Sequence, residues 1–242
     1  MVSNKAAAGL APLVAIVGSD GSGKSTISAD LIDWLAQSRP VEGAYLGLGT
    51  GDMGNRIKEW PIVGRWLERK LTKKAGQARD KKAKIPGLPT ALVIYTLSRI
   101  RLRRFNRMMA RRRQGIFIVT DRYPQTEFPG IYDGPGLSAA RAEGRPLQKL
   151  VKRERALYEE MASHIPSLII RLNIDADTAL QRKPDHKRAL LETKVAITPQ
   201  LKFGGAQIVD LSSLDPYETV LAGAKKAILE MLHTLGEEPK AI

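Results

Sequence analysis

Hydrophobic residues in this chain form short continuous runs that alternate with longer segments of helical periodicity. Five runs have the length of strands and cover residues 13–17, 44–48, 116–119, 168–172 and 207–209. A helical pattern extends from the first run to about Ala36, and a long Arg-rich one precedes the third. Continuous apolar strands separated by helices are typical of a parallel sheet that is buried on both faces. The pattern therefore predicts an α/β fold of three layers, a five-stranded parallel sheet with helices on both faces.

Two segments do not follow this pattern. Residues 49–89 are rich in glycine and lysine and are interpreted as a basic insertion. Residues 123–146 contain several prolines and glycines and are expected to form an irregular loop at the carboxyl end of the third strand. Long loops in compact domains are often functional. We expect one domain over residues 1–242 that carries both segments.

The strongest motif directly follows the first strand. It matches G-x-x-x-x-G-K-[ST] and consists of Gly18, Ser19, Asp20, Gly21, Ser22, Gly23, Lys24, Ser25 and Thr26. A glycine-rich turn between a strand and a helix lets backbone N–H groups surround phosphate oxygens at the positive end of the helix dipole. Lys24 is then expected to reach the β- and γ-phosphates of a nucleoside triphosphate, and the Ser25 hydroxyl to bind Mg²⁺. The motif predicts a P-loop NTPase fold.

A carboxylate and a cation follow the third predicted strand. Asp121 comes directly after Ile116–Thr120, which is where P-loop proteins carry a second ligand for Mg²⁺. An ordinary aspartate at a strand end is the alternative reading. Arg122 is next in the chain, and its guanidinium has the shape to hold an acceptor phosphate through two hydrogen bonds.

Four segments together resemble the thymidylate kinase family of P-loop kinases. They are the loop at 18–26, Asp121-Arg122-Tyr123, residues 172–182, and residues 208–210 before a C-terminal helix. The resemblance implies an ATP-dependent kinase with Mg²⁺ that transfers the γ-phosphoryl group to a small acceptor, with a nucleoside monophosphate as the first candidate. The residues it implies at the acceptor are Asp20, Arg99, Arg122 and Tyr123. The resemblance implies Lys24, Arg122 and Arg182 for catalysis. It also implies a basic lid around residues 182–198 whose cations are Arg182, Lys183, Lys187 and Arg188, with Arg182 and Arg188 binding ATP together with the loop at 18–26.

One turn departs from this family. After the second strand the family carries an Arg-Glu-Pro-Gly-Gly-Thr-like turn that helps to bind the acceptor, whereas this chain has Leu46-Gly47-Leu48-Gly49-Thr50-Gly51-Asp52. The glycines and the threonine are kept and the arginine is lost. Another nucleotide, a nucleoside or a sugar intermediate of polysaccharide synthesis therefore stays open as the acceptor.

The chain is strongly basic. Its 39 Lys and Arg residues against 25 Asp and Glu residues give a net charge of +14, which favours phosphorylated ligands or polyanions. The Arg-rich segment 99–113 and the Trp-containing segment 60–71 leave contact with nucleic acid or an anionic membrane open. Two alternative functions stay open, an NTP-dependent switch on such a surface and an inactive kinase fold kept for assembly. A homodimer also stays open.

Composition excludes several other classes. The chain has no cysteine, so disulfides, thiolate catalysis and iron–sulfur clusters are excluded. Its three histidines are far apart in sequence, so a histidine metal site is not expected. No apolar run reaches the roughly 20 residues of a membrane span, and no signal-peptide pattern is present at the start, so we expect a cytoplasmic protein.

Overall fold

A computed structural model describes residues 9–47, 87–139, 141–186 and 188–237. These residues group into two compact units. The first contains the residues up to Tyr45, Asn106–Tyr123 and the residues from Ile165 on, and the second contains Leu46–Phe105 and Pro124–His164. The predicted insertion up to residue 86, with the turn after Gly47 and the segment 60–71, lies outside the described residues.

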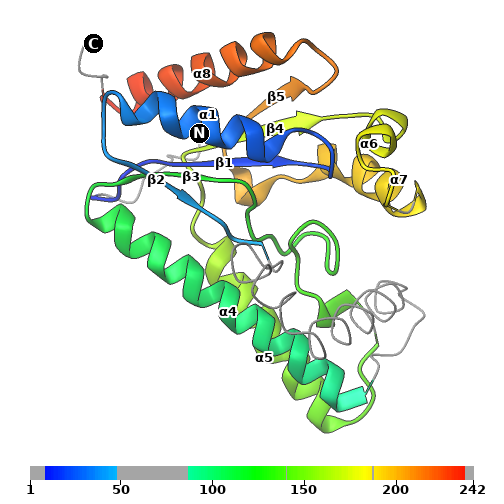
Figure 1. Ribbon diagram of the computed structural model, residues 1–242. Helices are drawn as coiled ribbons and strands as arrows, with labels where there is room; N and C mark the ends of the chain where they lie inside the picture. Colours follow the sequence, from blue (N-terminus) through cyan, green and yellow to red (C-terminus); the bar gives the residue numbers. More distant parts are fainter. Residues whose placement is uncertain (1–8, 48–86, 140, 187, 238–242) are drawn as a thin grey trace, which may run out of the picture. The chain divides into compact units, whose positions relative to one another are not determined.

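The first unit is built on a five-stranded sheet (Figure 1). Its strands are β1 (Leu13–Gly18), β2 (Val41–Ala44), β3 (Phe117–Thr120), β4 (Leu168–Asn173) and β5 (Ile208–Ser212). All neighbouring strands are parallel, and the order across the sheet is β2-β3-β1-β4-β5. The predicted α/β P-loop NTPase fold is confirmed.

The predicted position of the second strand was wrong by several residues. The apolar run at 44–48 suggested the strand, but β2 consists of Val41–Ala44 and pairs with β3 from Val41 opposite Phe117 to Ala44 opposite Thr120. Because β2 is at the edge of the sheet, its residues stay partly exposed and do not need a continuous apolar run. The other four strands lie within a few residues of their predicted positions.

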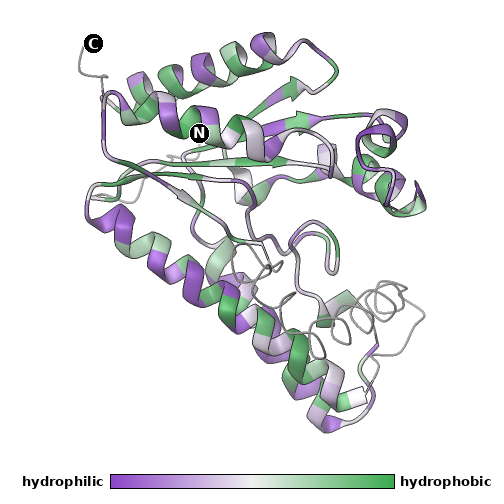
Figure 2. Ribbon diagram, viewed as in Figure 1, coloured by the Kyte–Doolittle hydropathy of each residue, from purple (hydrophilic) through white to green (hydrophobic). Residues whose placement is uncertain are grey.

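Two helices pack on one face of this sheet. They are α1 (Lys24–Ala36) and α8 (Tyr217–Thr234), which lie side by side in Figure 1. Leu31 of α1 and Ile228 of α8 join Val14, Ile16 and Ile170 of the strands in one buried cluster. Hydrophobic and hydrophilic residues alternate along both helices (Figure 2), as expected for helices with one side on the core.

The segment between β4 and β5 contains two short helices. They are α6 (Ala176–Arg182) and α7 (Arg188–Ile197), and the 3₁₀ turns η2 (Thr198–Gln200) and η3 (Phe203–Gly205) follow. Ile174, Ala179 and Leu191 form a small buried cluster of their own here. This segment coincides with the lid region predicted from the sequence.

The second unit combines α5 (Arg145–Ala162) with the first turns of α4 (Gly87–Arg113), whose last turns from Asn106 on belong to the first unit. Ala91 and Leu150 contribute to its buried cluster with Leu137 of the 3₁₀ turn η1 (Leu137–Ala139). Residues 87–89, which the sequence assigned to the insertion, instead begin α4, because a proline is tolerated in the first turn of a helix. None of the helices formed by the described residues is long and apolar enough to span a bilayer.

Candidate functional site

The phosphate loop has the strand–turn–helix context that its sequence predicted. It leaves β1 at Gly18, and α1 begins at Lys24. Gly21 and Gly23 have φ values of +86° and +84°, a conformation that favours glycine. A side chain at Gly18 would place its Cβ 2.5 Å from the Ser22 Oγ and 2.7 Å from the Leu172 carbonyl oxygen. The glycines of the motif are therefore required by the local geometry of the turn.

Polar groups are concentrated on this turn. The Lys24 side chain is buried, and its Nζ donates a hydrogen bond of 2.7 Å to the Ser19 carbonyl. The hydroxyls of Ser19 and Ser22 are buried and have no hydrogen-bond partner among the described residues. Buried hydroxyls without partners are rare in folded proteins. Together with the amino end of α1, these groups form a cradle that fits an anion.

A pair of oxygen ligands lies beside the loop. Because β1 and β3 are parallel neighbours, with Ala15 opposite Thr120, the residues that follow them meet at one edge of the sheet. The Ser25 Oγ lies 3.5 Å from the Asp121 Oδ2. A hydroxyl and a carboxylate are hard oxygen donors of the kind that Mg²⁺ prefers, so the residues present fit this ion.

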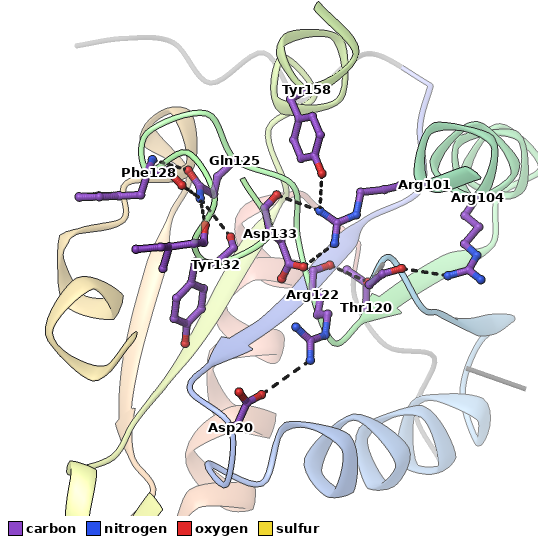
Figure 3. A network of polar contacts seen from close by, with 12 residues as sticks. Asp20, Arg101, Arg104, Thr120, Arg122, Gln125, Phe128, Tyr132, Asp133 and Tyr158 are labelled. Atoms are coloured by element: carbon purple, nitrogen blue, oxygen red, sulfur yellow. Dashed lines mark hydrogen bonds and ion pairs between the residues drawn. The ribbon is translucent and has the colours of Figure 1, made fainter. Parts of the chain in front are cut away.

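Asp20 is the centre of a cluster of positive charges. Its carboxylate forms an ion pair with the Lys194 ammonium, and it lies 3.8 Å from Nη2 of Arg122 (Figure 3) and 3.7 Å from Nε2 of His186. Burial alone would raise the pKa of Asp20, but Lys194, Lys24 and Arg122 outweigh it and lower the pKa to about 2. Asp20 is therefore ionised throughout the neutral range.

The lid segment is attached to the loop and to the sheet by two arginines. Arg182, at the end of α6, donates 3.1 Å and 3.0 Å hydrogen bonds to the carbonyls of Gly21 and Ser213. Arg171 of β4 forms a bidentate ion pair with Asp210, at 2.6 Å and 2.7 Å, and donates to three carbonyls of the turn that follows α7. These contacts fix both ends of the segment that carries Lys194.

The remaining predicted site residues have different environments. Thr26 is exposed on the first turn of α1, and Arg99 is exposed on the second unit's part of α4.

Tyr123 is buried, which raises its pKa, although the nearby Arg112 opposes that shift. Arg188 is exposed and pairs with Asp177 at 2.7 Å and with Glu192 at 3.5 Å. Their assignments to ATP or to the acceptor stay predictions.

Sequence reasoning missed two residues of the cluster. It named four cations of the lid between residues 182 and 188, whereas the contacts to Asp20 come from His186 and Lys194 of the same segment. The available signal was the general basicity of residues 182–198. That signal does not say which side of α7 faces the loop.

The second unit contains a separate buried network (Figure 3). Arg101 of α4 forms an ion pair with Asp133 and donates to the Asp133 carbonyl at 2.9 Å and to the Tyr158 hydroxyl at 3.2 Å. Glu154 of α5 accepts hydrogen bonds from Ser98 at 2.8 Å and from the backbone N–H groups of residues 136 and 137. Burial raises the pKa of Glu154, and these donors oppose the shift. This network fixes the loop that precedes η1.

Comparison with known proteins agrees with the fold. The structure is similar to that of the deoxyadenosine kinase from M. mycoides, with a TM-score of 0.52 and 14% identity over 89% of this chain and 98% of the other. The protein is thus a P-loop NTPase by fold.

No protein-family model matches the chain. It is 42% identical over 217 residues to the "Uncharacterized ATP-binding protein YghR" of Escherichia coli strain K12, which covers 89% of this chain and 86% of that protein. It is 45% identical over 217 residues to the "Uncharacterized ATP-binding protein YghS" of the same strain, which covers 89% of this chain and 92% of the other. The chain belongs to the family of these two Escherichia coli proteins.

Proposed function

We propose that the protein is an ATP-dependent kinase that transfers the γ-phosphoryl group to a small acceptor. The observation that carries the proposal is Asp20, a single carboxylate that three cations surround beside the Ser25–Asp121 pair. Such a concentration of cations suits a phosphate group in transfer, because phosphoryl transfer is catalysed mainly by positioning and charge neutralisation. The names of the relatives YghR and YghS, which describe ATP-binding proteins, support ATP as the donor.

The donor side of the reaction is assigned to the phosphate loop. Residues 18–26 bind the phosphates of ATP, with Lys24 on the β- and γ-phosphates, while Arg182 acts from the lid. Ser25 and Asp121 hold Mg²⁺, which when bound neutralises charge on the phosphate oxygens. The bond between the γ-phosphorus and the bridging oxygen breaks, and its electron pair stays with ADP.

The acceptor side is assigned to Arg122 and, from the resemblance, to three further residues named below. Arg122 is 34% exposed and lies 3.8 Å from Asp20, so its guanidinium can reach both a ligand and the loop. The Thr120 hydroxyl donates to the Arg122 carbonyl at 2.9 Å and fixes the turn that presents the side chain. The new bond joins the γ-phosphorus to an oxygen of the acceptor phosphate. Tyr123, Arg99 and Asp20 complete the proposed acceptor set.

A nucleoside monophosphate is the first acceptor we propose, in keeping with the resemblance to the thymidylate kinase family. A nucleoside is the second candidate, because the similar structure from M. mycoides is that of a deoxyadenosine kinase. A sugar intermediate of polysaccharide synthesis is tested beside both.

The test incubates the purified protein with Mg²⁺-ATP and separate panels of nucleoside monophosphates, nucleosides and sugar phosphates. ADP release and the phosphorylated product are both measured. We expect ADP release that depends on one class of acceptor. The Lys24→Ala variant should lose at least about a thousandfold of this activity, because it lacks the cation on the transferred group.

Two outcomes would contradict the kinase proposal. One is ATP turnover that needs no acceptor, and the other is turnover that only nucleic acid or anionic vesicles stimulate. Either would favour an NTP-dependent switch, and a steep dependence of nucleic-acid affinity on salt would support that alternative. The Lys226→Ala variant is the matched control, since Lys226 is an exposed lysine of α8 with an ion pair to Glu230.

A further inference from the structure

A cavity of about 390 Å³ lies at the amino end of the sheet, within the first unit. Pro12, Pro40 and Phe117 line it, and they stand at the starts of β1, β2 and β3. The phosphate loop and Asp121 follow the opposite ends of β1 and β3. Helix α1 runs from the loop to Ala36, which is about 20 Å at 1.5 Å per residue. The cavity is therefore separate from the proposed ATP site.

Hydrogen bonds of the backbone hold the walls of this cavity in place. The Phe117 N–H donates to the Pro40 carbonyl at 3.0 Å. Ala11, which also lines the cavity, is held twice by Arg112. Its N–H donates to the Arg112 carbonyl at 3.1 Å, and its carbonyl accepts from the Arg112 Nε at 2.8 Å. A preformed cavity binds a ligand without the cost of ordering its walls.

Arg39 supplies the only positive charge among the described residues that line the cavity. Its side chain is 15% exposed, and its guanidinium carbon lies 5.8 Å from the centre of the Phe117 ring. Burial and this cation–π contact fix the guanidinium at the cavity wall. The Arg39 Nε is buried and has no hydrogen-bond partner among the described residues. Buried donors without a partner are rare, so this one indicates a place for an acceptor.

The present partner of Arg39 is held weakly. The Glu237 Oε2 accepts a hydrogen bond of 3.1 Å from Nη1, and the Glu237 carbonyl accepts one of 3.5 Å from Nη2. The Glu237 side chain is 43% exposed, and ion pairs of exposed side chains contribute little to stability. A guanidinium binds a carboxylate more strongly when two parallel hydrogen bonds join them. A carboxylate from a ligand can therefore take the place of the Glu237 side chain.

The other lining residues define the rest of the ligand. One cation suits a single negative charge better than the nearly double charge of a phosphate group. Leu10, Pro12 and Pro40 suit a small apolar body. We infer that this cavity binds a small organic acid, whose carboxylate replaces Glu237 on Arg39. This site is independent of the proposed kinase function. The alternative is an ion pair that only attaches the residues after α8 to the end of α1.

The test titrates benzoate, an aromatic carboxylate, into the full chain and measures binding by NMR. Benzyl alcohol is the uncharged comparison. We expect a dissociation constant in the millimolar range for benzoate, and binding of benzyl alcohol at least about tenfold weaker, as for lost hydrogen bonds to a charged group. Glu237→Gln should bind benzoate about two- to fivefold more tightly, because the competing carboxylate is gone. Arg39→Leu should weaken benzoate binding at least about tenfold.

Matched changes elsewhere control for the loss of a charge. Glu230→Gln and Arg155→Leu each remove one member of an exposed ion pair and should leave benzoate binding unchanged. Saturating Mg²⁺-ATP should also leave it unchanged, and competition would place the benzoate in the phosphate loop instead. The thermal midpoint shows whether each variant is folded, and Glu237→Gln decides the question if Arg39→Leu does not fold. No saturable binding, equal affinity of the wild type and Glu237→Gln, or tighter binding of phenyl phosphate would overturn the inference.

Discussion

The two polar clusters of this protein are built in opposite ways. In the first unit, Asp20 is a single carboxylate among three cations, and its side chain and that of Lys194 keep some exposure. In the second unit, the Arg101 side chain is fully buried and is matched by one carboxylate, Asp133. Glu154 there is bound by uncharged donors.

This difference is the one expected between the proposed ligand site and a structural network. A buried network in which a carboxylate lies against the cation fixes the chain. A partly exposed cluster that brings several cations together favours a bound anion such as a phosphate. Both clusters contain an ion pair, so the presence of an ion pair alone does not reveal function.

The largest expected effect on stability comes from a change in the buried network of the second unit. Arg101→Met leaves Asp133 without the cation that balances it, and breaking such a pair costs about 3–5 kcal/mol. We expect a large fall in the free energy of unfolding and faster hydrogen exchange over residues 124–137. Arg103→Met, at an exposed position two residues along α4, should change both values little. Similar losses for the two variants would contradict the structural role of Arg101.

The next largest effect tests the charge cluster through pH. The pKa of Asp20 is lowered from 3.8 to about 2, which corresponds to about 2 kcal/mol of stability. A lowered pKa contributes stability that is complete above about pH 4 and is lost as the pH falls towards 2. Asp20→Asn should therefore be less stable than the wild type at pH 7, with the difference shrinking below pH 4. Denaturant unfolding from pH 2 to 7 measures this, and parallel curves for the two proteins would contradict it.

Glu154 should show a smaller effect with the opposite dependence on pH. Glu154→Gln places an amide donor where the Leu137 N–H needs an acceptor, at a cost of about 1–2 kcal/mol. Burial raises the pKa of Glu154 in the folded protein. Ionisation of Glu154 therefore destabilises the fold as the pH rises above the ordinary pKa of a glutamate. The advantage of the wild type over the variant should be smaller at pH 7 than at pH 4. An advantage that grows with pH would show that the three donors outweigh burial.

The smallest effect is expected for Arg188. Because its guanidinium is exposed and already paired with Asp177 and Glu192, Arg188→Ala should leave the thermal midpoint nearly unchanged. We expect its affinity for Mg²⁺-ATP to fall less than about threefold. A tenfold loss measured by calorimetry would instead support the ATP contact predicted from the sequence, and would require Arg188 to leave its present partners.

Local patterns in the sequence were sufficient for the fold and for the contiguous part of the candidate site. The residues of the phosphate loop are contiguous, and their glycines encode the backbone conformation directly, as the φ values at Gly21 and Gly23 show. Asp121 could be placed because it follows a strand, and parallel strands bring their carboxyl ends to one edge. β2 was misplaced because an edge strand lacks the apolar signal that marks a buried one.

The sequence by itself determined a P-loop NTPase fold, the glycine-rich turn at residues 18–26 and the closeness of Ser25 to Asp121. Only the tertiary structure decided that Lys194 and His186, rather than Arg188, contact Asp20. It also decided that Arg101, one arginine among many on α4, is buried against Asp133. The physical reason is the same in both cases, since charged residues look alike in sequence, and their partners are set by which elements the folded chain brings together.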